Sequence, residues 1–465
     1  ASRIWFVSFT RTAVREIRDR LLTHLKGSET AHALKIATLD SYAWTIHSGF
    51  DATAKLIGSY DDNIEKVLEL IRSDDEVRDY LETVEHIIVD EAQDIVGVRA
   101  DLVLALVSRL APACGVTILS DAAQAIYGFT DDVKESGGGA QLLSLVERLQ
   151  DGELGSSFVR KRLRTVFRTK CPVLRKIFTD VRQKLLDGST DPHALLESIH
   201  SGIKELVPDR VLHVEKQEPD PSEHMFVLYR RRAEVLLASS FLSAKLVPHR
   251  LRMSGLPSCI FPWVGACLSE FTAPHLSSLT FRALWNDKVW GTQWETTEAG
   301  LAWSLLVRYA GRTEDLVEMS RLRAVLGRTQ PPADFCSGDV GSGRPLLGTI
   351  HACKGREAPT VRLMLPKLSS GLGESAEEAR VLFVGATRAK ERLLIGDGYT
   401  TSQWARTLDG SGRVYALTTT SGTLRSSLAV MVMWAPRSWP ERSSTRPLKM
   451  CVGPRRTCSL CPGCR

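Results

Sequence analysis

The sequence lacks a long apolar run, which limits the class of protein it can encode. A helix that crosses a bilayer needs about 20 consecutive apolar residues, and the most apolar stretch, LAVMVMW at 428–434, is far shorter. The first residues, ASRIWFVSFT, also lack the charged leader and the small-residue cleavage site of a signal peptide. We therefore expect neither a membrane-spanning helix nor a secretory signal in these 465 residues.

The sequence also lacks a cysteine framework over most of its length. Six of the ten cysteines are scattered singly between Cys114 and Cys353, which suits a reducing compartment, the cytoplasm or the nucleus. The other four form a C-x₆-C-x₂-C-x₂-C run at the end of the chain: Cys451, Cys458, Cys461 and Cys464. This run could hold zinc or an iron–sulfur cluster. We favour an accident of composition, because the short spacings leave little chain between the corners of a tetrahedral site.

Outside the C-terminal tail, the chain has almost no excess charge. The formal net charge is +6, but residues 425–465 contribute eight Lys/Arg and one acid, Glu441. The remaining residues therefore sum to about −1. A surface that binds the phosphates of a nucleic acid must then come from a local cluster of basic residues.

Short apolar strands separated by a helix predict a parallel sheet in the N-terminal part. The strands are RIWFVSFT (3–10), EHIIVD (85–90) and GVTILSD (115–121), and DLVLALVSRL between the last two has helical character. Strands that are apolar on both faces are typical of a parallel sheet covered by helices on both sides.

A second group of strands predicts a second α/β unit. Its members are RVLHVEK (210–216), MFVLYR (225–230), PTVRLMLPK (359–367) and RLLIG (392–396). Residues 255–345 lie between the early and late strands, are rich in Trp, Gly and Pro, and indicate an inserted domain. From residue 401 onward the chain is rich in Ser, Thr, Arg and Pro and lacks a period, so we expect it to be largely disordered.

The stretch IIVDEAQD (87–94) ends an apolar strand with a pair of acids, Asp90 and Glu91. Carboxylates at the carboxyl end of a parallel strand can hold Mg²⁺ for a nucleotide and polarise the attacking water. A solvated acidic loop is the alternative for this pair taken alone. Gln124 follows the next strand, where a glutamine can sense a γ-phosphate, and the aromatic residues Tyr127 and Phe129 come shortly after it.

Together with segments near the C-terminus, these stretches resemble the motifs of UvrD/Rep-like superfamily 1 DNA helicases. The match covers roughly residues 1–400 and consists of several motifs in the family's order. The matching segments are FTRTAVREIRDRL (9–21), ATLDSY (37–42), VDEAQD (89–94), SDAAQAIYGF (120–129), LRTVFRTK (163–170), TIHACKGREAPTV (349–361) and VGATRAKERLLI (384–395).

The resemblance implies an α/β fold of two RecA-like parallel-sheet domains, that is, a P-loop NTPase fold. Its first domain, 1A, would span residues 1–155. The second, 2A, would span 156–254 and 346–400 and be interrupted by a helical or irregular accessory insertion at 255–345. A poorly ordered basic tail would follow at 401–465. ATP and Mg²⁺ would bind in the cleft between the two domains, and single-stranded DNA would cross them, usually with 3′-to-5′ movement in replication, repair or recombination.

The resemblance also assigns roles to single residues. Asp90 would hold Mg²⁺ and Glu91 would activate water. Gln124, Arg168 and Arg388 would surround the γ-phosphate, and Glu357 would contact the ribose. The implied nucleic-acid contacts are Phe9, Thr10, Thr38, Tyr127, Phe129, Thr349 and His351.

One motif of the family is missing, because no G-x-x-x-x-G-K-[ST] segment occurs in the 465 residues. That loop cradles phosphates in P-loop NTPases. We favour a fragment or mis-started sequence over a degenerate, non-catalytic DNA-binding relative, because the acids and arginines that serve ATP are retained. Either way, we expect this chain to be inactive as it stands. A GTPase or kinase-like switch is a third hypothesis, which Arg168 and the pair Thr387–Arg388 disfavour. Milder departures are Ala123, Val166, Phe167, Arg356 and Ala358 in place of the family's usual residues.

Overall fold

The structure is a computed structural model of the 465-residue chain. The structure describes residues 3–10, 13–14, 17, 21, 34–55, 60–126, 144–151, 158–187, 191–256, 259–292, 294–295, 297–328, 331–368, 377–399, 406–407 and 414–415. Much of the FTRTAVREIRDRL segment (9–21), the two aromatic residues Tyr127 and Phe129, and nearly all of the tail, including its four cysteines, lie outside this part. None of the helices within the described residues is both long and apolar enough to span a membrane.

The first lobe is built on a parallel four-stranded sheet with the order β2-β1-β3-β4. Its strands are β1 (Ile4–Ser8), β2 (Leu34–Thr38), β3 (His86–Asp90) and β4 (Gly115–Ile118), and each neighbouring pair runs parallel. The helices are α2 (Leu39–Phe50), α3 (Tyr60–Ser73), α4 (Asp75–Glu82), α5 (Gly97–Arg109) and α7 (Leu145–Asp151). Side chains of β1 and β3, including Trp5 and Val89, form one core with these helices. The predicted strands at 3–10, 85–90 and 115–121 are therefore confirmed.

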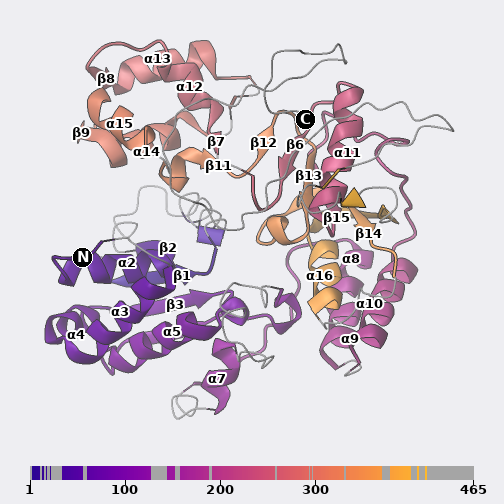
Figure 1. Cartoon of the computed structure of the whole chain (residues 1–465), viewed down its shortest axis with the longest axis horizontal. Helices are drawn as coiled ribbons and strands as arrows, with labels where there is room; N and C mark the ends of the chain where they lie inside the picture. The colour runs from indigo at the N-terminus through magenta and orange to yellow at the C-terminus, as the bar shows by residue number, and fades with distance from the viewer. Residues whose placement is uncertain are drawn as a thin grey trace.

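The second lobe is built on a six-stranded sheet with the order β12-β6-β13-β5-β14-β15. Its strands are β5 (Met225–Tyr229), β6 (Arg250–Arg252), β12 (Val340–Gly341), β13 (Leu346–Thr349), β14 (Ala358–Leu365) and β15 (Ala389–Asp397). All neighbours are parallel except β12 and β6. In Figure 1 this lobe lies to the right of the first lobe.

Helices cover both faces of the second sheet. Phe226 and Leu228 of β5 contribute to the core shared with α8 (Pro172–Lys176), α9 (Arg182–Asp187), α10 (Pro192–Leu206) and α16 (Glu377–Ala386). Met225, Val227 and Tyr229 contribute to the opposite core, with α11 (Arg232–Ala244). Successive residues of a strand point to opposite faces, so a strand buried on both faces must be apolar throughout, and MFVLY is.

The predicted strand at 210–216 is wrong. Arg210 forms only an isolated bridge with Ile395, after which the amides of Lys216 and Gln217 both donate to the carbonyl of His213 in a turn. The apolar residues Val211 and Val214 are nevertheless buried in the core beside α11. Their alternation with polar residues thus reflects packing of an irregular segment.

The inserted region has a core of its own. It contains α12 (Pro262–Leu268), α13 (Ser278–Lys288), α14 (Ala299–Ala310) and α15 (Met319–Leu326). Three short antiparallel strands accompany them, β8 (His275–Ser277), β9 (Gly311–Thr313) and β10 (Leu316–Glu318), and β7 (Cys259–Ile260) pairs with β11 (Cys336–Ser337). Trp263, Phe281, Trp285 and Phe335 fill the centre. The aromatic residues that seemed irregular in the sequence therefore form a compact aromatic core.

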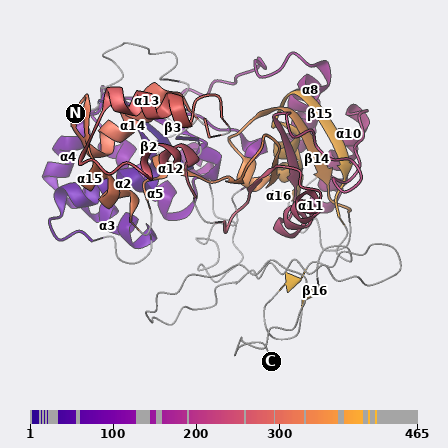
Figure 2. The ribbon, with the colours of Figure 1, turned by 90° about the horizontal axis from the view of Figure 1, so that it is seen from above.

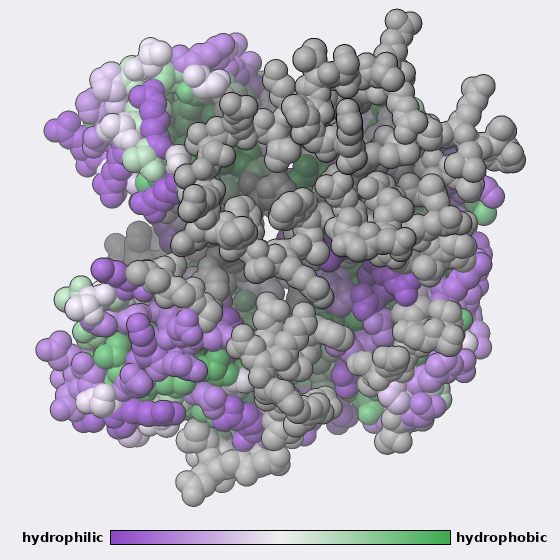
Figure 3. Space-filling view, viewed as in Figure 1, coloured by the Kyte–Doolittle hydropathy of each residue, from purple (hydrophilic) through white to green (hydrophobic). Residues whose placement is uncertain are grey.

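The arrangement of the three parts is consistent between views. Figures 1 and 2 both place the inserted region on the same side of the second lobe as the first lobe. Figure 3 shows hydrophilic side chains over most of the visible face of the first lobe, with apolar side chains only in small areas. A remaining pair of two-residue strands, β16 (Arg406–Thr407) and β17 (Val414–Tyr415), lies in the otherwise undescribed tail.

Candidate functional site

The candidate site begins where β3 ends, at Asp90. The next residue, Glu91, has φ 53° and ψ 39°, a left-handed conformation that is uncommon for a residue other than glycine. A short 3₁₀ turn, η2 (Ala92–Asp94), follows, and its three side chains are buried. The strained residue therefore turns the chain sharply at the edge of the sheet and directs Gln93 and Asp94 inward.

Gln93 and Asp121 link the end of β3 to the end of β4. Gln93 Nε2 donates to Glu91 Oε2 at 2.5 Å, and Gln93 Oε1 accepts from the Asp121 amide at 2.9 Å. Asp121 caps the 3₁₀ turn η3 (Ala122–Gln124) by accepting from the Ala123 amide. Gln124 Nε2 then donates to Asp121 Oδ2 at 2.9 Å. This chain of bonds fixes the amide of Gln124 so that its oxygen faces away from Asp121.

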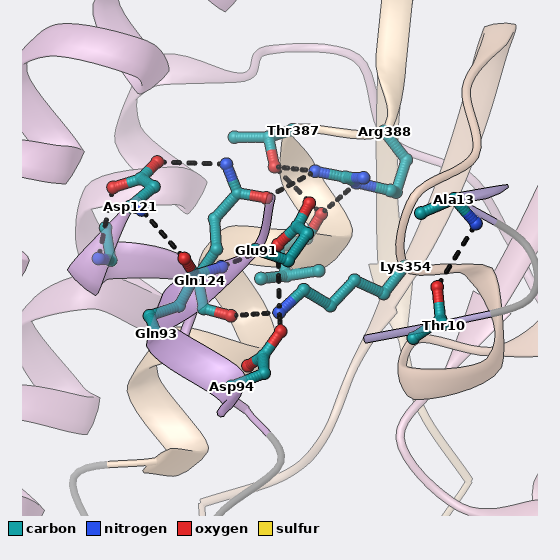
Figure 4. Close-up of polar contacts among 12 residues, drawn as sticks. Thr10, Ala13, Glu91, Gln93, Asp94, Asp121, Gln124, Lys354, Thr387 and Arg388 are labelled. Atoms are coloured by element: carbon teal, nitrogen blue, oxygen red, sulfur yellow. Dashed lines mark hydrogen bonds and ion pairs between the residues drawn. The ribbon is translucent and has the colours of Figure 1, made fainter. Parts of the chain in front are cut away.

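The oxygen of Gln124 accepts from an arginine of the second lobe. Arg388 Nη2 lies 3.2 Å from Gln124 Oε1, and the two groups face each other in Figure 4. Arg388 is 2% exposed, and it also donates to the Val384 carbonyl at 2.9 Å and to Thr387 Oγ1 at 3.0 Å. The structure thus brings together Gln124 and Arg388, which the sequence assigned to one site.

Lys354 reaches across from the second lobe to the acids of the first. It follows the 3₁₀ turn η7 (His351–Cys353), and its Nζ contacts Asp94 Oδ2, the Gln124 carbonyl at 2.6 Å and Glu91 Oε2 at 3.5 Å. Both Lys354 and Asp94 are almost completely buried. Figure 4 shows this ammonium group among acceptors that all belong to the first lobe.

Arg168 and Glu357 form an ion pair close to Arg388. Arg168 Nη2 lies 2.8 Å from Glu357 Oε1, and its Nη1 donates to the Thr387 carbonyl at 3.1 Å. Lys390 Nζ lies 3.5 Å from the other oxygen of Glu357. Two residues expected on the γ-phosphate and the ribose therefore contact each other in this structure.

Arg182 is a further arginine of the second lobe that contacts the first lobe, as Arg388 does, and the sequence did not indicate it. Its Nη2 and Nε lie 2.8 and 3.2 Å from Asp121 Oδ1. Arg182 begins α9 directly after a π-helical turn, η5 (Ile177–Val181). A π turn shifts the rotational position of the residues that follow it and is frequent at functional sites. Here the π turn precedes Arg182, which contacts Asp121, the residue that accepts a hydrogen bond from Gln124.

Burial perturbs the acids of this site. It raises the pKa of Asp90 to about 6, and the neighbouring Glu91 charge adds to that effect while Lys354 opposes it. Burial likewise raises the pKa of Asp94 to about 7, against the opposing charge of Lys354. A buried carboxyl group with a raised pKa favours its neutral form, and a nearby cation stabilises its ionised form. A cation at this edge, whether an ammonium group or a metal ion, therefore stabilises the site.

Asp90 and Glu91 are the residues that could hold a magnesium ion at this edge of the sheet. Mg²⁺ prefers oxygen ligands and is commonly held by one or two carboxylates together with substrate phosphates, and Asp90 and Glu91 supply carboxylates at the strand end. Ser8 pairs with Asp90 across the sheet, and its buried hydroxyl oxygen has no hydrogen-bond partner among the described atoms. No group of three side chains suited to a metal was found in the described part of the chain.

Most residues predicted to touch nucleic acid have local contacts in the structure. Thr10 Oγ1 accepts from the Ala13 amide, Thr38 Oγ1 accepts from the Ser41 amide to cap α2, and Thr349 Oγ1 accepts from the Ala352 amide. Phe9 packs against the core of the first lobe. Burial lowers the pKa of His351 to about 4, so this side chain is neutral at pH 7. Their roles toward nucleic acid stay predictions, as do those of Tyr127 and Phe129.

Sequence reasoning missed five residues of the site: Gln93, Asp94, Asp121, Arg182 and Lys354. The DEAQD stretch could have indicated the first two, because a buried amide and acid after a strand require partners. Lys354 lies within a recognised segment, although the residue itself carries no distinguishing pattern. For Arg182 the sequence gives no signal, since it is one basic residue in a basic helix.

Comparisons with known proteins find similarity in both lobes. A family model described as an AAA domain matches residues 1–130, and one described as a UvrD-like helicase C-terminal domain matches residues 346–395. The chain is 34% identical over 122 residues to the ATP-dependent DNA helicase UvrD1 of Mycobacterium leprae (strain TN). That match covers 24% of this chain and 15% of the relative, so the chain matches only a small part of the relative's length.

A crystal structure is also similar at low level. The Pif1 helicase from Candida albicans superposes over 87% of this chain and 92% of its own, with a TM-score of 0.37 and 13% identity. The two family models match the segments that contribute Asp90, Glu91 and Gln124 on one side and Lys354, Glu357 and Arg388 on the other. In these matched segments the chain is therefore similar to UvrD-like superfamily 1 helicases.

Proposed function

We propose that this chain is the motor part of an ATP-dependent DNA helicase or translocase. The observation that carries the proposal is the direct contact between Gln124 of the first lobe and Arg388 of the second. A site completed by groups from two lobes is assembled only when the lobes approach each other. Such a site couples occupancy to movement of the lobes.

Each residue has a role that follows from its chemistry. Asp90 would hold Mg²⁺, which neutralises phosphate charge when bound, and Glu91 would orient the attacking water. Gln124, Arg168 and Arg388 would surround the terminal phosphate, where guanidinium groups stabilise the charge that develops. Glu357 would accept from the ribose once released from Arg168.

The nucleic acid would lie along both lobes. The candidate contacts are those predicted from the sequence: Phe9, Thr10, Thr38, Tyr127, Phe129, Thr349 and His351. Alternating closure and opening of the lobes would move a single strand stepwise. We extend the proposal to 3′-to-5′ movement on DNA within an intracellular replication, repair or recombination process.

A second candidate function is non-catalytic binding of nucleic acid. It is favoured by one observation, the absence of a G-x-x-x-x-G-K-[ST] segment from the 465 residues. Without the phosphate-cradling amides and lysine of that loop, the acids and arginines alone hold a nucleotide weakly. We therefore expect this chain to bind single-stranded DNA and to hydrolyse ATP slowly or not at all.

The test is to measure binding and turnover on the same purified chain. A labelled single-stranded oligonucleotide and a fluorescent ATP analogue with Mg²⁺ are titrated separately, and phosphate release is followed with and without the oligonucleotide. We expect Arg388→Met to weaken binding of the ATP analogue and to leave the affinity for the oligonucleotide unchanged. The motor proposal would be rejected if the wild-type chain bound neither the oligonucleotide nor the ATP analogue. Turnover that is stimulated by the oligonucleotide and abolished in Glu91→Gln would instead show that this chain is catalytic without the loop.

A further inference from the structure

One exposed segment joins the two lobes and is strongly basic. Residues 159–165, VRKRLRT, are called the connector strand below. They contain four basic residues and no acid, whereas the chain outside its tail is nearly neutral. All seven residues are exposed. The segment is therefore a local concentration of positive charge on an otherwise balanced surface.

Both ends of the connector strand are fixed. Phe158, just before it, packs against the core of the first lobe. After it, Arg168 contacts Glu357 and the Thr387 carbonyl, and Thr169 is 3% exposed in the second lobe. Between these anchors the backbone is irregular, and it forms no hydrogen bond with the backbone of any other described residue. The strand is thus held between the lobes with its side chains in solvent.

The charges of the connector strand are not neutralised within the described residues. No described carboxylate lies within ion-pair distance of Arg160, Lys161, Arg162 or Arg164. Some other arginines of the chain are paired: Arg99 contacts Asp40 and Asp61, and Asp339 alone contacts three arginines. The connector strand therefore gathers four basic groups within seven residues, and none of the four has an ion-pair partner among the described residues.

Apolar side chains alternate with these cations. Val159 is 81% exposed and Leu163 is 88% exposed. An extended chain advances about 3.3 Å per residue and its side chains alternate in direction. If a ligand held the segment extended, Arg160, Arg162 and Arg164 would recur about every 7 Å along one side, with Val159 and Leu163 on the other. A ligand that fits must offer repeated negative charge together with apolar surface.

We propose that the connector strand binds the phosphate backbone of single-stranded nucleic acid. The guanidinium group is planar and weakly hydrated and matches phosphate oxygens with two parallel hydrogen bonds. A single strand also exposes the apolar faces of its bases, which the exposed Val159 and Leu163 can contact. This inference rests on the proposed function for the existence of a nucleic-acid ligand. It adds a contact on the segment that joins the two lobes, between Phe158 and Arg168.

An acidic protein segment is a different ligand for the same charges. Such a segment would offer carboxylates and no bases. In that case, substitutions in the connector strand would not change the affinity of the chain for nucleic acid. The two ligands are separated by the dependence of binding on salt, because each neutralised phosphate of a single strand contributes about 0.7 to the slope of log affinity against log salt.

The experiment compares two triple variants of the full 465-residue chain. The first is Arg160→Gln, Arg162→Gln, Arg164→Gln. The matched control, Arg282→Gln, Arg312→Gln, Arg321→Gln, removes three exposed arginines of the inserted region. Binding of a labelled oligothymidylate of about 20 nucleotides is measured by fluorescence anisotropy between about 50 and 200 mM salt. Circular dichroism verifies that both variants fold, which is expected because all six side chains are exposed.

We expect the connector variant to bind on the order of tenfold more weakly and its salt slope to decrease by about 2, with the control unchanged. An unchanged slope in the connector variant, with the wild-type chain binding well, would overturn this inference and leave the proposed function intact. Equal losses in both variants would also overturn it, because the effect would then be one of overall charge. If instead the connector variant lost affinity only for a polyglutamate peptide, the partner would be an acidic protein. Absence of oligonucleotide binding by the wild-type chain would reject the proposed function together with this inference.

Discussion

The two faces of the interlobe site are built in different ways. The first-lobe face is acidic and amidic, and all of its groups lie within residues 90–124 at the ends of two adjacent strands. The second-lobe face is cationic, and its groups come from four separate segments, at Arg168, Arg182, Lys354 and Arg388. One face is thus a local product of a strand–turn pattern, and the other is assembled from residues far apart in the sequence.

This difference shows what holds the lobes together. Two acids of the first face, Asp90 and Asp94, are buried enough to have a raised pKa, so they are costly to ionise in isolation. The cations of the second face offset that cost only while the lobes are in contact. We infer that each face is unstable alone and that removing either sign of charge shifts the balance between contacted and separated lobes.

The largest effect is expected from Lys354→Met. The substitution leaves Asp94, which is 2% exposed, without the ammonium group that contacts it. Removing one partner of a buried ion pair typically costs about 3–5 kcal/mol. Because Asp94 can take up a proton, we expect the lower end of this range, about 3 kcal/mol, at neutral pH. Urea unfolding followed by tryptophan fluorescence measures the loss.

A second variant tests whether this loss comes from the pair. Lys354→Met combined with Asp94→Asn removes both charges and should recover much of the stability. If the double variant were no more stable than Lys354→Met alone, the lysine would act through packing, and the two faces would not be linked by charge.

The next effect concerns pH. An aspartate in an unfolded chain loses its proton near pH 4, whereas Asp94 in the folded protein has a pKa of about 7. The folded protein therefore holds a proton that the unfolded chain has lost between about pH 4 and pH 7, and the stability gained from it declines as the pH rises through that window. Asp90, with a pKa of about 6, acts in the same direction.

Thermal unfolding by circular dichroism from about pH 5 to pH 8 measures this decline. We expect the midpoint to fall with rising pH in the wild-type chain and to fall less in Asp94→Asn, which has no proton to lose. A midpoint that rose over the same range in the wild-type chain would mean that the acids of the first face are fully compensated by the cations opposite.

The smallest effect is expected from Arg182→Met. The pair with Asp121 is about one-third exposed on both sides, so solvent screening limits its contribution to about 0.5–1 kcal/mol. A double-mutant cycle with Asp121→Asn isolates that energy. A coupling energy indistinguishable from zero would remove Arg182 from the set of groups that join the faces, although Gln124 would remain bonded to Asp121.

The first lobe and its half of the site were largely predictable. The strands β3 and β4 are short and apolar, and they end in polar groups, so their ends were expected at one edge of a parallel sheet. Asp90, Glu91 and Gln124 all lie at that edge. The left-handed conformation of Glu91 was not predictable from the sequence. It accompanies tertiary contacts of the next residues, of Gln93 with the Asp121 amide and of Asp94 with Lys354.

The second lobe was less predictable for physical reasons. Residues 210–216 alternate like a strand, yet they pair with β15 at only one position and then turn. The inserted region lacks a clear period because its core is formed by aromatic residues spread from Trp263 to Phe335. Hydrophobic periodicity reveals helices and strands that bury one regular face. It does not reveal a core formed by aromatic side chains at irregular spacings in the sequence.

By itself the sequence predicted two sheets with apolar strands, a polar edge on the first sheet and a set of segments that resemble the motifs of UvrD-like helicases. Hydrophobic alternation and strand-end chemistry are local properties, so a single chain segment carries them. Tertiary structure alone decided which cations meet that edge. Lys354 and Arg182 are ordinary basic residues in the sequence, and only the approach of the two lobes places their charges against Asp94 and Asp121. Low solvent exposure strengthens the contact of Lys354 with Asp94, whereas solvent weakens the contact of Arg182 with Asp121.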